Sequence, residues 1–204
     1  MMKKMCWKLP SRYVFVLLAL AMAGLVPLSE SHSNTAALAP GTVLPNGLHY
    51  QPWIKEHKQF SLKEILASAK AEGKGLAILF EEKGCPYCAR LHAENFTFDD
   101  VTTYMTKHFD IIQIDHQGDR QVTMLDGKKL SERAFARAMK VTSTPTTLFM
   151  KQGGAENFRM PGFIPAAYYR AGYQYVVEKG PASGVGFIPW VKAFAKRAQE
   201  KQTQ

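Results

Sequence analysis

The feature that most constrains this chain is a pair of cysteines two residues apart, Cys85 and Cys88, with Pro86 and Tyr87 between them. A short continuous apolar run at residues 76–80 precedes the pair, and such a run predicts a strand buried on both faces. A helical pattern follows the pair directly. The sequence therefore places two thiols where a strand gives way to a helix.

This position suits sulfur chemistry. Free backbone N–H groups and the positive end of the helix dipole would face the sulfur of Cys85 and favour its thiolate, which is the nucleophilic form. Pro86 falls at the first helical position, where a missing N–H costs little. Cys88 lies within one turn and can attack a mixed disulfide formed at Cys85, releasing the reduced partner. The pattern predicts dithiol–disulfide exchange through an exposed attacking thiol and a resolving thiol kept close.

Two other uses of the pair are less well supported. A structural disulfide across two residues would close a very short loop and constrain almost nothing. A zinc site would need a second pair of ligands, and the only other cysteine is Cys6. The histidines are scattered along the sequence: His32, His49, His57, His92, His108 and His116. We therefore predict no metal site.

The N-terminus resembles an export signal. Basic residues between positions 3 and 12 precede an apolar run over residues 13–28, which is shorter than the ~20 residues of a comfortable membrane helix. We expect residues 1–33 to be a signal peptide or an uncleaved anchor. Small residues at 21–23 and at 37–39 both fit a cleavage site. The predicted location is the periplasm, with the protein soluble or tethered by this segment.

The remaining chain is expected to form one domain. Residues 34–59 are rich in proline and glycine and are predicted to be a linker or an irregular arm, followed by a domain at 60–201. The 46% hydrophobic content is ordinary for a globular protein. The formal net charge is +9, but no run of five basic residues occurs, so nucleic-acid binding is not expected.

Strands and helices are predicted to alternate along the domain. The expected strands are 76–80, 110–115, 146–150 and 157–160. The expected helices are 62–71 with a Ser61 cap, 88–95, 99–109, 131–139, 165–177 and 190–198. Residues 117–130 are predicted to be a surface insertion with a hairpin turn at Asp126-Gly127. This order predicts a mixed sheet covered by helices on both faces.

A proline directly before the strand at 146–150 needs a physical reason, because proline removes a ladder donor. One reason is a cis Thr144-Pro145 peptide bond that shapes a substrate groove. The other is a trans proline that simply begins the strand. The local sequence leaves both open.

Taken together, the segment 79–88, the Thr144-Pro145 element and Gly162 after a hairpin resemble the thioredoxin superfamily over roughly residues 60–200. The resemblance implies an α/β thioredoxin-like fold, with a central mixed β-sheet flanked by helices and an insertion before the cis-proline strand. It implies that Cys85 attacks and Cys88 resolves. It also implies a substrate-binding surface formed by Pro86, Tyr87, Thr144 and Pro145, where the Thr144 backbone pairs with a bound peptide.

Within the superfamily, the chain is similar to the exported group that includes the SoxW thioredoxins of sulfur-oxidation clusters. It departs from cytosolic thioredoxins at two places. Gly84 occupies the position of a tryptophan, and Leu79 occupies that of a buried aspartate that relays the proton of the resolving thiol. Glu81, Glu82 or water is expected to replace that aspartate.

The function expected from these features is that of an enzyme, a thiol–disulfide oxidoreductase that reduces disulfides of a partner protein. Its only redox group would be the Cys85–Cys88 disulfide, without a further cofactor. A membrane electron donor of the DsbD type would supply electrons to a monomeric protein. Two alternatives stay open at this point: a disulfide oxidase or isomerase, and a metal-binding module that uses the two cysteines.

Overall fold

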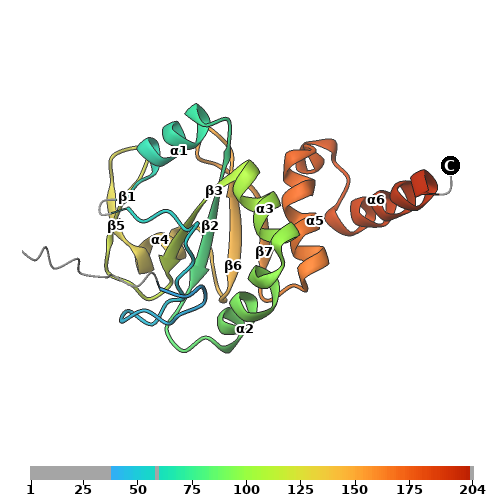
Figure 1. Cartoon of the computed structure of the whole chain (residues 1–204). Helices are drawn as coiled ribbons and strands as arrows, with labels where there is room; N and C mark the ends of the chain where they lie inside the picture. Colours follow the sequence, from blue (N-terminus) through green and yellow to red (C-terminus); the bar gives the residue numbers. More distant parts are fainter. Residues whose placement is uncertain (1–37, 58–59, 203–204) are drawn as a thin grey trace, which may run out of the picture. The chain divides into compact units, whose positions relative to one another are not determined.

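The structure, a computed structural model, describes residues 38–57 and 60–202 (Figure 1). The predicted signal segment, with Cys6 and His32, lies outside the described residues. The strands are β1 Phe60–Ser61, β2 Gly75–Glu81, β3 Phe109–Asp115, β4 Gln121–Thr123, β5 Lys129–Ser131, β6 Thr146–Met150 and β7 Glu156–Pro161. The α-helices are α1 Leu62–Ala71, α2 Pro86–Glu94, α3 Asp99–His108, α4 Glu132–Ala138, α5 Ala166–Val177 and α6 Phe187–Gln202. Two 3-10 helices are η1 Asn95–Thr97 and η2 Gly180–Ser183.

The main sheet has four strands in the order β3-β2-β6-β7 (Figure 1). Strands β2 and β3 are parallel, whereas β6 is antiparallel to both of its neighbours. This confirms the predicted mixed sheet. A second sheet, β1-β4-β5, pairs the hairpin of the insertion with the residues just before α1. Its strands are two or three residues long, too short to show a hydrophobic period, so the sequence did not predict them.

The side chains of β2 alternate between two hydrophobic cores. Leu76, Ile78 and Phe80 pack with apolar residues of α1 and α4 on one face. Ala77 and Leu79 pack with residues of α2, α3 and α5 on the other face. Because successive strand residues point to opposite faces, Glu81 shares the face of Leu79. This places a carboxylate at the end of β2, on the side covered by α2.

Most helix boundaries follow the signals in the sequence. The Ser61 hydroxyl accepts a hydrogen bond from the Glu64 backbone N–H at 3.4 Å, as the predicted cap of α1 requires. The predicted turn at residues 126–127 joins β4 to β5, with Gly127 at φ 83°. Helix α6 begins at Phe187, earlier than predicted, and Pro189 lies in its first turn. Proline is tolerated there because the first N–H groups of a helix have no intrahelical partner.

The described part of the N-terminal segment, residues 38–57, is an irregular arm that packs on the domain. Leu48, His49 and Gln51 are buried. Isolated bridges pair Val43 with His49 and Ile54 with Ile111 of β3. The arm therefore contributes side chains to the interior near the end of β2. No helix in the described part of the chain is long and apolar enough to cross a membrane.

Candidate functional site

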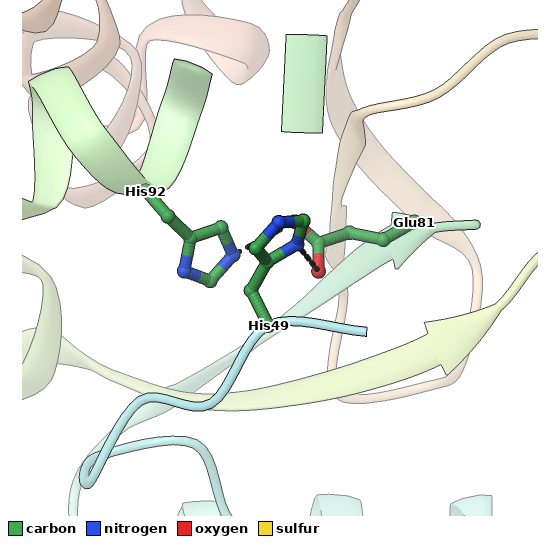
Figure 2. A group of neighbouring side chains, drawn as sticks. All are labelled: His49, Glu81 and His92. Carbon is green, nitrogen blue, oxygen red and sulfur yellow. Dashed lines mark hydrogen bonds and ion pairs between the residues drawn. The ribbon is translucent and has the colours of Figure 1, made fainter. Parts of the chain in front are cut away.

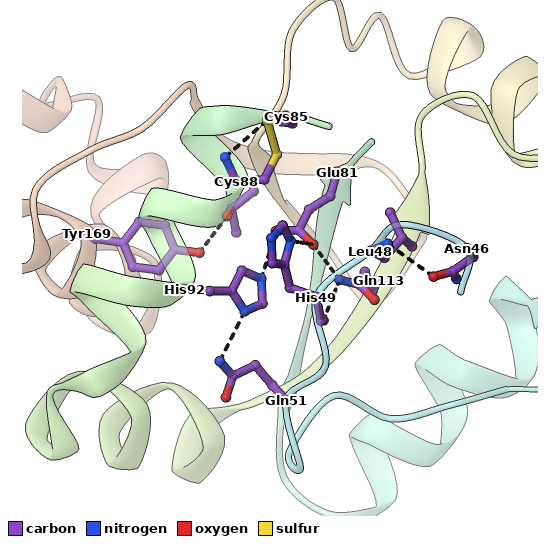
Figure 3. Close-up of polar contacts among 11 residues, drawn as sticks. Asn46, Leu48, His49, Gln51, Glu81, Cys85, Cys88, His92, Gln113 and Tyr169 are labelled. Atoms are coloured by element: carbon purple, nitrogen blue, oxygen red, sulfur yellow. Dashed lines mark hydrogen bonds and ion pairs between the residues drawn. A yellow bond between two sulfur atoms is a disulfide. The ribbon is translucent and has the colours of Figure 1, made fainter. Parts of the chain in front are cut away.

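Cys85 and Cys88 form a disulfide at the beginning of α2, with their Cα atoms 5.2 Å apart (Figure 3). Cys85 is the N-cap residue of the helix, and its sulfur accepts a hydrogen bond from the Cys88 backbone N–H at 3.0 Å. Pro86 opens the helix, as predicted. The sulfur of Cys85 therefore receives one of the N–H groups that a helix start leaves free, which is the environment expected of a thiol that ionises readily.

A tight turn leads from β2 into the disulfide. The Cys85 backbone N–H donates to the Glu82 carbonyl oxygen at 3.3 Å, and Gly84 between them has φ 75°. This left-handed conformation costs glycine little, whereas a residue with a Cβ would be strained. The glycine at the place of the thioredoxin tryptophan is thus favoured by the backbone conformation of this turn.

The sheet topology brings Pro145 to the same end of the molecule as the disulfide. Phe80, near the end of β2, pairs with Thr146, the first residue of the antiparallel β6. The residues just before β6 therefore lie beside the loop that follows β2. The Thr144-Pro145 peptide bond is cis, which resolves the choice that the local sequence left open. The Thr144 hydroxyl donates to the Glu82 carboxylate at 2.8 Å, which ties this element to the loop before Cys85.

The predicted site residues differ in exposure. Cys88 is 0% exposed and Cys85 is 6% exposed, whereas Tyr87 between them is 56% exposed. The expected exposed thiol is therefore nearly covered in the disulfide form, although it is the more accessible sulfur of the pair. Pro86 and Tyr87, in the first turn of α2, are the exposed residues of the motif.

A network of buried polar side chains lies behind the disulfide (Figure 3). The Glu81 carboxylate accepts a hydrogen bond from His92 Nε2 at 2.8 Å and another from the Gln113 amide. The Gln51 amide donates to His92 Nδ1 at 3.0 Å. Because each of these polar groups has a partner, the interior can accommodate the carboxylate.

His49 joins this network from the arm. Its ring stacks on the ring of His92 with centroids 4.7 Å apart, and its Nδ1 lies 3.9 Å from a Glu81 carboxylate oxygen. Burial lowers the pKa of His49, an effect that the Glu81 carboxylate opposes and the nearby His92 reinforces. Two histidines that are scattered in the sequence are therefore neighbours in the fold. The three residues are the group in the described part of the chain whose geometry could hold a metal ion.

Glu81, rather than Glu82, provides a carboxylate in the interior near the place of the missing aspartate. Glu82 is partly exposed and bonds to Thr144 and lies near His116. The position of Glu81 could have been found from strand alternation, because it is two residues after Leu79. The position of His92 follows from its helix, because residues four apart, here Cys88 and His92, share one face. No signal in the sequence indicated that the arm would bring His49 and Gln51 to the same place.

Arg90 does not form part of this network. Its guanidinium pairs with Glu94 at 2.6 Å and lies over the ring of Phe163, 4.2 Å from the ring centroid. This placement agrees with a partly exposed helix residue rather than a partner of the thiolate.

Comparisons with known proteins support the architecture. A family of thioredoxin-like domains matches residues 62–176. No curated protein sequence matches the chain significantly. Among solved structures, a thioredoxin-fold protein from Helicobacter pylori has 17% identity and a TM-score of 0.56, covering 74% of this chain and 92% of its own. That likeness shows a shared fold.

Two further structures are similar over shorter parts of this chain. A thioredoxin from Thermus thermophilus has 25% identity and a TM-score of 0.47, covering 64% of this chain and 95% of its own. The C-terminal domain of Neisseria meningitidis DsbD in the oxidised form has 15% identity and a TM-score of 0.42, covering 57% and 97%.

Proposed function

Because the chain belongs to the family of thioredoxin-like domains, we propose that Cys85 and Cys88 are the redox centre of a thiol–disulfide oxidoreductase that reduces disulfides of a partner protein. The observation that carries this proposal is the disulfide at the start of α2, beside the cis Thr144-Pro145 bond. A disulfide across two residues adds little stability, so its placement on a helix start is best explained by chemistry.

The reaction begins from the dithiol form. The Cys85 thiolate attacks one sulfur of the partner's disulfide, which forms a mixed disulfide and releases one partner thiolate. The Cys88 thiolate then attacks the Cys85 sulfur, which restores the Cys85–Cys88 disulfide and releases the second partner thiolate. Two electrons pass to the partner, and its two thiolates each take up a proton.

The substrate would lie as an extended segment across the exposed edge of the site. Thr144 and Pro145 lie beside the loop before Cys85, which supports the expectation that the Thr144 backbone pairs with such a segment. Exposed Tyr87 supplies an aromatic surface next to the sulfur. Main-chain pairing gives affinity for many sequences, which suits a protein that recognises a disulfide rather than one side chain.

We further propose that the protein acts as a monomer in the periplasm, without a redox cofactor beyond the Cys85–Cys88 disulfide, and receives its electrons from a membrane donor of the DsbD type. The basic and apolar pattern of residues 1–33 supports export. The insertion before the cis-proline strand and the motif Cys85-Pro86-Tyr87-Cys88 support a place in the exported group that resembles the SoxW thioredoxins.

Insulin reduction by dithiothreitol tests the chemistry. The wild-type chain should accelerate precipitation of the insulin B chain, and Cys85→Ser should abolish the acceleration because no attacking thiolate remains. Cys6→Ser is the matched control, since it removes the other cysteine of the chain and should leave the rate unchanged. Equal rates for wild type and Cys85→Ser would contradict the proposal.

The reduction potential tests the direction, and hence the choice between a reductase and an oxidase or isomerase. Equilibration with glutathione should give a potential near or below about −200 mV for a reductase. A potential near about −120 mV would contradict this direction and would favour the oxidase.

A further inference from the structure

Three residues from distant parts of the chain meet under the disulfide. His49 comes from the arm, Glu81 from the end of β2 and His92 from α2 (Figure 2). One ligand atom of each lies within 4.8 Å of the others. Their exposed fractions are 7%, 0% and 3%, so the cluster is formed in the interior rather than on an acidic surface.

One ring nitrogen of the cluster has no hydrogen-bond partner in the part of the chain that the structure describes. His49 Nδ1 is buried, and among the described residues none forms a hydrogen bond with it. It is directed toward the Glu81 carboxylate, 3.9 Å away, which is too long for a hydrogen bond (Figure 2). Buried polar atoms are nearly always paired, so an orphan in a cluster of ligand side chains requires an explanation.

We propose that His49, Glu81 and His92 bind a zinc ion. Two imidazoles and one carboxylate form a donor set that zinc uses in proteins, and a water molecule can occupy the fourth position. Tetrahedral zinc with ligand distances near 2.1 Å needs ligand atoms about 3.4 Å apart. The observed separations are 2.8 Å between Glu81 Oε1 and His92 Nε2 and 3.9 Å between the other carboxylate oxygen, Oε2, and His49 Nδ1. Because one ligand atom of each residue lies within 4.8 Å of the others, side-chain movements of about 1 Å bring the three to this geometry.

The surrounding amides are placed to orient the ligands. Gln113 donates to the Glu81 carboxylate and also to the His49 carbonyl oxygen, the latter at 3.1 Å. Gln51 contacts His92 Nδ1, the ring nitrogen on the far side from Glu81. A histidine bound to zinc through Nε2 carries a proton on Nδ1, which the Gln51 carboxamide can accept after rotation of its amide group. Glu81 and His92 therefore have the outer partners that metal ligands normally show, and Gln113 holds His49 through its backbone.

The test uses the oxidised full-length chain without a histidine tag, because the disulfide then prevents Cys85 and Cys88 from binding metal. All variants carry Cys6→Ser, which removes the remaining thiol. Titration with zinc chloride, followed by calorimetry and by metal analysis after dialysis, should show one ion per chain with a dissociation constant below about 1 μM. Zinc binding is measured here independently of disulfide exchange, so a failure of the zinc proposal is distinguishable from a failure of the proposed function.

Matched variants locate the ion. His49→Gln and His92→Gln should each weaken zinc binding at least tenfold, whereas His108→Gln, a histidine of α3 outside the cluster, should bind as the parent does. Circular dichroism melting checks that each variant is folded, and bound zinc should raise the melting temperature of the parent but not of His49→Gln. Because melting temperatures with and without zinc are compared within each variant, this comparison stays informative even if a substitution itself lowers stability.

Cobalt substitution gives an independent signature. Cobalt in the oxidised chain should give visible absorption without the near-ultraviolet thiolate band, since only nitrogen and oxygen ligands are available. Millimolar binding that is equal in the parent and in His49→Gln would overturn the proposal, as would no binding at all. The cluster would then be a hydrogen-bonded network around Glu81.

Discussion

The sulfur atoms of Cys85 and Cys88 have different environments because the two residues occupy different positions at the start of α2. Cys85 caps α2 and receives a backbone N–H on its sulfur, while Cys88 lies inside the first turn and is fully buried. A sulfur at the cap position gains stabilisation of its thiolate from the helix start. A buried sulfur one turn away is shielded from large reagents but remains within reach of Cys85.

This difference predicts unequal alkylation of the reduced chain. Below about pH 7, Cys85 should react with iodoacetamide much faster than Cys88, by tenfold or more, because more of it is thiolate and it is more accessible. Peptide mass spectrometry after timed quenching separates the two sites from Cys6. Equal, slow labelling of both motif cysteines would remove the argument for an activated nucleophile.

Single residues also show how far the sequence could predict the site. The motif and its helix start were predictable because cysteine, proline and helix capping act locally. The faces of Glu81 and His92 follow from strand and helix periodicity, but their contact with His49 was not predictable, because it depends on where an arm packs. An irregular arm has no hydrophobic periodicity, so its local sequence does not indicate which of its side chains are buried in the interior.

At the scale of elements, the turn from β2 into α2 depends on Gly84. A Cβ at this position would meet no atom within 4 Å, so the cost of a substitution is conformational rather than steric crowding. Gly84→Ala should lower the free energy of unfolding by about 1 kcal/mol because φ is positive. Gly153→Ala, also in open space, is the control and should cost less. Equal denaturation midpoints for both variants would contradict this account of the turn.

Strand β7 carries an ion pair that should make stability depend on pH. Arg159 donates to the Glu156 carboxylate at 2.7 Å and lowers the pKa of that group. A lowered pKa in the folded state contributes stability above the unfolded value of about 4.3, and the contribution is lost as the pH falls through the folded value. Glu156→Gln should therefore cost up to about 1 kcal/mol at neutral pH and less in acid. Urea denaturation across this range checks it, and a cost that grows in acid would contradict the sign.

The elements themselves were largely predictable. Within residues 38–57 and 60–202, four of the seven strands and all six α-helices follow the hydrophobic pattern, caps and turn residues of the sequence. The small sheet of β1, β4 and β5 was missed because its strands are too short to carry a period, and their pairing joins residues 60–61 to the hairpin of the insertion. Sequence patterns report local preference, whereas this sheet is determined by tertiary contacts.

At the scale of the whole molecule, the arm at residues 38–57 completes the domain. Ile54 pairs with β3, and the Lys55 ammonium bonds to Asp110 of β3 and to Glu72 after α1, each at 2.7 Å. The arm also covers Glu81 through His49 and Gln51. Its contacts therefore join the end of α1 to the edge strand β3 and reach the end of the neighbouring strand β2.

Removal of the arm should therefore destabilise the domain. A chain that begins at Phe60 should melt at least about 5 °C below one that begins at Leu38, because buried polar groups lose partners and apolar surface is exposed. Scanning calorimetry of the two chains makes the comparison. Equal melting temperatures would mean that the arm adds nothing to the fold.

The central claim is that Cys85 attacks a partner disulfide and Cys88 resolves the product. It is tested most directly by incubating reduced Cys88→Ser and reduced Cys85→Ser with a disulfide-bearing protein and measuring intact masses. Cys88→Ser should accumulate a mixed disulfide that maps to Cys85, because the resolving thiol is gone. Cys85→Ser should accumulate little or none. Equal trapping by both variants, or trapping at Cys88 alone, would contradict the assignment of these roles.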